Sequence, residues 1–127
     1  MDKIQADEYL KVLVSAYVWV ASSDDGVALV EMAKYEHVMV QSQFATQFEA
    51  TDMRHYFKDM VALLVDEYEH AVELTKMRLK EICGQEHLAQ EVIRICRAAV
   101  VGDGVIKEAE EVVLAEISAA LNIKADF

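Results

Sequence analysis

The sequence predicts an all-α protein, a compact bundle of about six to seven helices. Three observations favour this fold class: proline is absent, there are only four glycines, and apolar residues recur at helical spacing along most of the chain. Without proline and with few glycines, helices can run long and tight hairpin turns are scarce. A chain of 127 residues builds one hydrophobic core, so we expect a single domain over residues 1–127.

The first expected helix runs from about Ile4 to Ser22 and becomes apolar on nearly every face toward its C-terminal half. Such a helix belongs in the middle of a bundle. A β-strand over Val12–Val14 is the competing interpretation because two of its residues are β-branched. We discount it, since no turn signal brackets these residues and the sequence offers no second strand to pair with them. Ser22-Ser23-Asp24-Asp25-Gly26 then ends the helix with cap-forming side chains and a glycine.

The middle of the chain divides into three further helices. Their expected bounds are about Val27 or Ala28 to Phe44, then Thr51 as N-cap to about Val65, and, after a break at Asp66 or Glu67, Tyr68 to Cys83-Gly84. On the second of these helices, Phe57, Val61 and Leu64 are expected to form the inner face. Gly84 is the clearest C-terminal helix stop in the chain.

Two more helices complete the expected bundle. One spans about Glu86 to Val101 and is apolar on more than one face, which makes it the second candidate for a central position. Gly102-Asp103-Gly104 turns the chain into the last helix, from about Lys107 to Leu121. The apolar stripe expected on this last helix consists of Val112, Val113, Ile117, Ala120 and Leu121.

An Asp-Gly turn occurs twice. Sliding the chain along itself aligns Asp25-Gly26-Val27 with Asp103-Gly104-Val105. In both places an apolar helix leads into the turn and an outer helix follows it. The match indicates either an internal duplication, with two related helix–turn–helix halves, or only the common pattern of such turns.

The charge of the chain is strongly negative. With 12 Lys and Arg against 23 Asp and Glu, the formal net charge is −11 at pH 7. Such a surface repels phosphate backbones and anionic lipid headgroups, so we expect no nucleic-acid partner. The longest apolar run, Leu10 to Ala21, is shorter than the roughly 20 residues that span a bilayer. With no basic and apolar leader and only two cysteines, we expect a cytoplasmic protein without membrane insertion.

The second Asp-Gly turn resembles the second half of a calcium-binding EF-hand loop, because Asp103, Gly104 and Glu110 fall at the required offsets. The two earlier ligand positions are Ala99 and Val101, which carry no side-chain oxygen, so a high-affinity EF-hand is excluded. Two interpretations stay open. Either the aspartate and glycine are structural and the acidic residues complement the helix dipole, or clustered carboxylates bind a divalent cation weakly.

The sequence offers little for catalysis. It contains no glycine-rich phosphate loop and no nucleophile elbow, and both cysteines are expected on apolar helical stretches, where a thiol is normally inert. We therefore expect no catalytic residues and no enzymatic activity. His55 with Asp59, and Asp66 with His70, are each four positions apart, yet two ligands do not make a metal site. These histidines are expected to be ordinary hydrogen-bonded or solvated side chains.

A family resemblance rests on two stretches of sequence. Residues 96–106, Cys-Arg-Ala-Ala-Val-Val-Gly-Asp-Gly-Val-Ile, and the helix that follows through Glu110-Glu111 to Ile123, resemble the C-terminal signature of the TerB-like tellurite-resistance family. In this chain Gly102 replaces the alanine usual before the aspartate. Residues 20–27 resemble the first copy of that turn in the family, although Ala28-Leu29-Val30 stands where the family tends to be acidic.

The resemblance implies a non-enzymatic bacterial protein of the cytoplasm, a bundle of two related halves with a part in tellurite resistance or a wider stress response. It carries a metal-binding role over to Asp25, Asp103 and Glu110, and a structural turn role to Gly26 and Gly104. A divalent cation is then the candidate cofactor, and other Ter-system proteins are candidate partners. A homodimer is a further candidate. The alternative function is a scaffold or small-ligand-binding bundle with purely structural Asp-Gly turns and no metal.

Overall fold

The computed structural model describes residues 1–23, 32–100 and 106–123, and every structural statement below concerns these residues. Within them all regular structure is helical, which confirms the predicted all-α fold class. The helices are α1 (Lys3–Ser22), α2 (Met32–Met39), the short 3-10 helix η2 (Ala45–Gln47), α3 (Ala50–Asp66), α4 (Tyr68–Glu81), α5 (Glu86–Val100) and α6 (Glu108–Leu121). None of these described helices is both long enough and apolar enough to cross a membrane.

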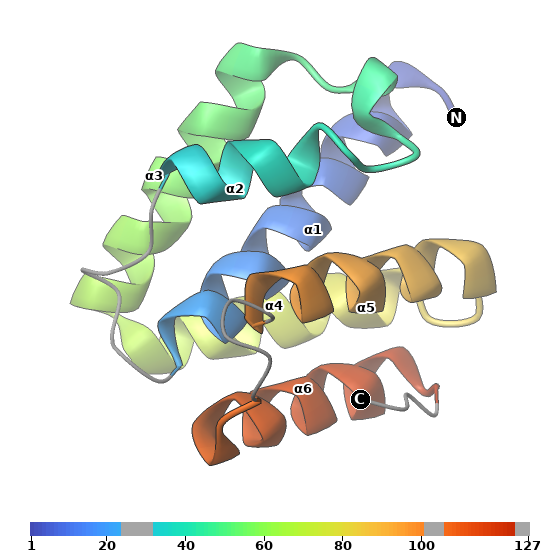
Figure 1. Ribbon diagram of the computed structural model, residues 1–127. Helices are drawn as coiled ribbons and strands as arrows, with labels where there is room; N and C mark the ends of the chain where they lie inside the picture. Colours follow the sequence, from blue (N-terminus) through green and yellow to red (C-terminus); the bar gives the residue numbers. More distant parts are fainter. Residues whose placement is uncertain (24–31, 101–105, 124–127) are drawn as a thin grey trace.

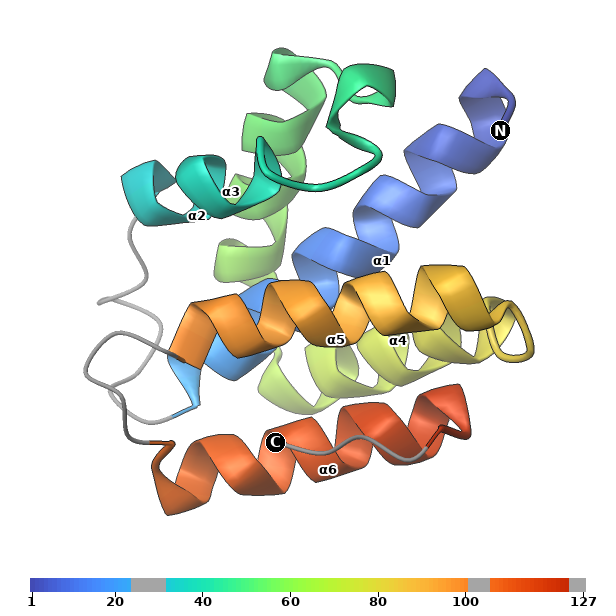
Figure 2. The same cartoon turned by 45° about the vertical axis from the view of Figure 1, so that its right-hand side comes forward.

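Helix α1 passes through the middle of the bundle, as its apolar character predicts (Figures 1 and 2). It packs against α3, α4, α5 and α6, and every residue from Val12 to Val20 is buried. Asp2 caps its N-terminus: the Asp2 carboxylate accepts a hydrogen bond from the Gln5 backbone N–H at 2.8 Å, and the Gln5 side chain accepts one from the Asp2 N–H at 3.3 Å.

Helix α5 is the second central element, again as predicted. It packs against α1, α2 and α6, and it buries residues on more than one face, including Val92, Ile95 and Cys96. The Tyr9 hydroxyl of α1 donates to the Leu88 carbonyl oxygen of α5 at 2.7 Å. The two apolar helices are therefore held together by both packing and a buried hydrogen bond.

The C-terminal end of helix α2 differs from the prediction. The helix ends at Met39 rather than Phe44, and Val40 is 60% exposed. The physical reason lies on α5, where the Glu91 carboxylate binds Ser42 and the Gln43 backbone N–H and draws the chain away from the helical path. The predicted start of this helix lies outside the described residues.

Two details of α3 also differ from prediction. The helix begins at Ala50 with Glu49 in the N-cap position, so the prediction of Thr51 as N-cap is wrong. Its buried face is formed by Met53, Phe57, Met60 and Leu64, while the predicted Val61 is only partly buried. The predicted break before α4 is confirmed, because α3 ends at Asp66 and α4 begins at Tyr68.

Helix α6 lies along the outside of the bundle, next to α4 and α5 (Figures 1 and 2). Val112 was expected in its apolar stripe but is 56% exposed, and Leu114 is buried instead. The buried face of α6 also includes the polar residues Glu110 and Ser118. Lys76 of α4 forms an ion pair with Glu116 of α6 at 3.1 Å, which joins the outer surfaces of the two helices.

Candidate functional site

Glu110 is the one candidate metal ligand that the structure describes; Asp25, Asp103 and the turn glycines Gly26 and Gly104 lie outside the described residues. Glu110 belongs to the first turn of α6 and is 9% exposed. Its Oε1 accepts a hydrogen bond from the Lys107 backbone N–H at 3.0 Å. The carboxylate therefore caps the N-terminus of α6, where its negative charge also complements the helix dipole.

Neither histidine pair forms a metal centre with a third ligand. His55 Nε2 and Asp59 Oδ2 are 3.1 Å apart on the exposed side of α3. Asp66 is the last residue of α3 whereas His70 belongs to α4, so this pair does not share a helix. Over residues 1–23, 32–100 and 106–123 no three or more His, Cys, Asp or Glu side chains are grouped to hold a metal ion.

The two cysteines have different surroundings. Cys96 is fully buried on α5, and burial raises the pKa of its thiol well above the ordinary value. A thiol of this kind is unreactive. Cys83 is exposed and follows the end of α4, so the prediction that both cysteines lie on apolar helical stretches is wrong for Cys83.

Glu91 is a buried carboxylate that sequence reasoning missed. It is 3% exposed, and it accepts hydrogen bonds from the Ser42 hydroxyl at 2.9 Å, the Gln43 backbone N–H at 2.9 Å and Arg94 Nε at 2.5 Å. Burial acts to raise the pKa of Glu91, but these hydrogen bonds outweigh it and hold the pKa below its ordinary value. The sequence signal that could have revealed this buried carboxylate is an acidic residue within an apolar helix, followed by an arginine three positions later.

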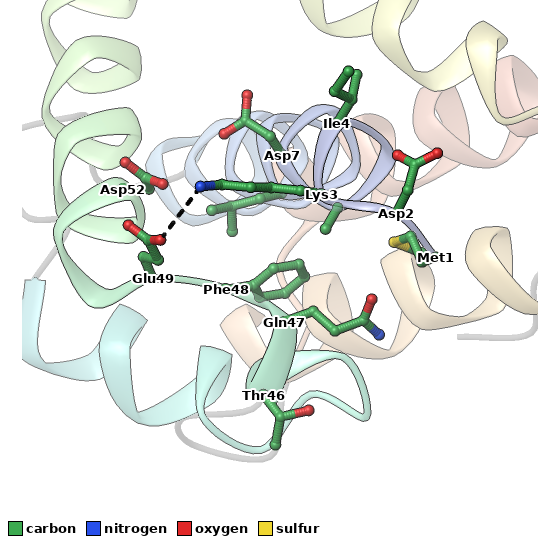
Figure 3. Close-up of a pocket in the computed structure, with 12 residues that line it drawn as sticks. Met1, Asp2, Lys3, Ile4, Asp7, Thr46, Gln47, Phe48, Glu49 and Asp52 are labelled. Carbon is green, nitrogen blue, oxygen red and sulfur yellow. Dashed lines mark ion pairs between the residues drawn. The ribbon is translucent and has the colours of Figure 1, made fainter.

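A cavity of about 630 Å³ lies between residues 1–10 and residues 46–52 and is here called the N-terminal groove. Its lining includes four carboxylates and one lysine; these are Asp2, Asp7, Glu49, Asp52 and Lys3. Figure 3 shows Asp7, Glu49 and Asp52 gathered around the Lys3 ammonium at one end, with Met1 and Ile4 toward the other. The groove thus has an acidic end with three carboxylates and an apolar end, where Met1 and Ile4 lie beside one further carboxylate, Asp2.

Comparison with protein-family models gives a match over most of the chain. A family model described as Tellurite resistance protein TerB matches residues 11–126. The chain belongs to the TerB family. No curated protein and no solved structure that was compared with the chain matches it. The TerB match covers both Asp-Gly turns and Glu110, which confirms the resemblance seen in the sequence.

The N-terminal groove of this TerB-family chain lies partly outside the matched residues, because residues 1–10 precede them. Its charges are only weakly neutralised. Lys3 Nζ is 4.0 Å from Glu49 Oε1, and the Lys3 side chain is 92% exposed. Asp7, by contrast, accepts a hydrogen bond from the Tyr56 hydroxyl at 2.5 Å and lies 3.5 Å from Lys11 Nζ. Glu49 and Asp52 are therefore the carboxylates most available to a ligand.

Proposed function

We propose that this TerB-family chain is a non-enzymatic adaptor of tellurite resistance and the stress response. In this proposal it binds a divalent cation through Asp25, Asp103 and Glu110, and it presents acidic helical surfaces to protein partners such as other Ter-system proteins. The TerB match supports the association with tellurite resistance. The cation, the adaptor role and the partners are our inference.

The observation that carries the proposal is the placement of the acidic side chains. Two groups of them stand apart: three lie in the first turn of α6 (Glu108, Glu110 and Glu111), and four line the N-terminal groove. Figures 1 and 2 place the start of α6 and the N-terminus at opposite ends of the molecule. With a net charge of −11, both ends attract cations or basic protein surfaces.

One observation favours the alternative function, a scaffold or small-ligand-binding bundle with purely structural turns. The Glu110 carboxylate already has a structural task, because it accepts the Lys107 N–H at the start of α6. On this alternative, chelators leave the melting temperature unchanged, and Gly104→Val lowers stability by placing a β-branched residue in a glycine turn.

The cation role is tested with metal-free protein. Backbone amide NMR shifts are followed while Ca²⁺, Mg²⁺ and Zn²⁺ are added in turn at near-physiological salt. We expect saturable shifts at Asp25, Gly26, Asp103 and Gly104, and weaker binding by Asp103→Asn without unfolding. Glu73→Gln, an exposed carboxylate of α4, is the matched control. Shifts spread over all carboxylates, or an unchanged titration of Asp103→Asn, would remove the cation from the proposal.

The adaptor role is tested in cells that depend on this chain for growth on tellurite. We expect Asp103→Asn to reduce growth on tellurite while Glu73→Gln supports full growth. Because the chain is proposed to act without catalysis, the purified protein alone should leave tellurite chemically unchanged. Turnover of tellurite by the purified chain would overturn the non-enzymatic proposal.

A further inference from the structure

The N-terminal groove combines features that the proposed cation site does not use. Its volume of about 630 Å³ lies within the range of protein cavities that receive small ligands. It joins the first turns of α1 to the segment that leads from η2 into α3, two parts of the chain that are distant in sequence. Each part contributes both acidic and apolar side chains, so the groove exists only in the folded protein.

The apolar end of the groove is unusually open to water. Ile4 is 77% exposed and Met1 is 48% exposed, although both are large apolar side chains. The Phe48 ring and Leu10 contribute to the lining but are already buried in the core. An apolar side chain brought against Ile4 and Met1 would remove surface from water that the fold itself leaves uncovered.

The acidic end of the groove has carboxylates that the fold engages only weakly. Glu49 occupies the N-cap position of α3, yet its side chain makes no capping hydrogen bond. Its ion pair with Lys3 is long and exposed, and such pairs contribute little to stability. Asp52 lies in the first turn of α3 and also points into the groove (Figure 3). A cation that enters the groove therefore finds Glu49 and Asp52 available.

We propose that the N-terminal groove docks a basic amphipathic segment of a protein partner. Apolar side chains of the segment cover Ile4 and Met1, and its Lys or Arg side chains face Glu49 and Asp52, displacing Lys3. The charge complementarity selects this occupant. A metal ion alone would leave Ile4 and Met1 exposed, and a second copy of the chain would bring another −11 charge to an acidic surface. This inference rests on the adaptor role and names the chemistry of one partner.

The test uses the full chain and three labelled synthetic peptides of equal length. The first places leucine and lysine on opposite faces of a helix, the second replaces leucine with serine, and the third replaces lysine with glutamate. Binding is measured by fluorescence anisotropy and located by amide NMR shifts. We expect the leucine–lysine peptide to bind with shifts centred on residues 2–7 and 46–52, and the other two to bind at least about tenfold more weakly, roughly 1.4 kcal/mol.

Two variants of the groove have matched controls elsewhere. The single variant Ile4→Ser is compared with Val112→Ser. The double variant Glu49→Gln/Asp52→Asn is compared with the double variant Glu69→Gln/Glu73→Gln. Val112, Glu69 and Glu73 are exposed and lie outside the groove. All the substituted side chains are exposed except Asp52, which is half-buried. Circular dichroism verifies that each variant is folded. We expect each groove variant to weaken binding by about tenfold while the controls bind as wild type.

The outcomes separate this inference from the adaptor role. Peptide binding with shifts centred on another surface, or equal losses in groove and control variants, would overturn the groove while leaving an adaptor that works elsewhere. Equal binding of the leucine–lysine and serine–lysine peptides would show that the peptide is attracted by charge alone. That result would also overturn the groove as the docking site. Loss of growth on tellurite in Asp103→Asn but not in Ile4→Ser would support the adaptor role without the groove.

Discussion

The Ser42 hydroxyl donates to the buried Glu91 carboxylate, with 2.9 Å between Oγ and Oε2. This bond, together with that from the Gln43 N–H, joins the segment after α2 to α5. The same segment continues through Phe44, whose ring packs edge-on against Tyr9 with centroids 5.1 Å apart, into η2 and the wall of the N-terminal groove. Glu91 therefore holds in place one side of the groove without lining it.

Glu91→Gln should lower the free energy of unfolding by about 1–3 kcal/mol at pH 7, because it removes charge-assisted hydrogen bonds at a buried site. Arg94 is half-exposed, which limits the cost of leaving its guanidinium without a partner. Urea denaturation followed by the fluorescence of Trp19, the one tryptophan of the chain, measures the change. Glu73→Gln should have no comparable effect, and equal stability of the two variants would contradict the assignment.

The same carboxylate should make stability depend on acid pH. The pKa of Glu91 is below its ordinary value in the folded protein, so the unfolded state takes up the proton first as pH falls. Its contribution is complete above the ordinary value of 4.5 and is lost as pH falls further, through the folded pKa. The stability difference between wild type and Glu91→Gln should therefore shrink below that pH. A difference that stays constant down to acid unfolding would be inconsistent with this linkage.

Gly84→Ala should destabilise the turn between α4 and α5 by about 1 kcal/mol. The cause is backbone strain alone: Gly84 has φ +91°, and a Cβ added there would meet no atom within 4 Å. Thermal or urea denaturation checks the loss, with Gln85→Ala as a neighbouring exposed control. If Gly84→Ala were as stable as wild type, the left-handed conformation at this position would be wrong.

Tyr9→Phe should cost about 1 kcal/mol, because it removes the buried hydrogen bond to the Leu88 carbonyl while leaving the ring in place. Tyr68→Phe serves as control, since the Tyr68 side chain is exposed at the start of α4. Urea denaturation of both variants compares the two hydroxyl groups directly. A Tyr9→Phe variant as stable as the control would mean that the hydroxyl contributes nothing to joining α1 and α5.

The two central helices could be predicted because the signal for their burial lies within the sequence of each helix. α1 and α5 are apolar on several faces, and no partner is needed to read that pattern. The end of α2 could not be predicted in the same way, since it depends on Glu91, 49 positions away from Ser42. The groove was missed for the same reason, because its acidic and apolar residues come from two segments that are distant in sequence.

The two roles considered for Glu110, capping α6 and binding a cation, can be tested separately. Glutamine at this position keeps a carbonyl oxygen that can accept the Lys107 N–H but removes the charge. In metal-free protein, Glu110→Ala should lower the free energy of unfolding by about 1 kcal/mol, and Glu110→Gln by clearly less. In the cation titration both variants should bind more weakly than wild type, because both lack the carboxylate. Glu111→Gln, in the same turn but exposed, is the control for charge alone. If Glu110→Gln bound the cation as tightly as wild type, the role of Glu110 would be confined to capping α6, and the cation would have to be held by other residues.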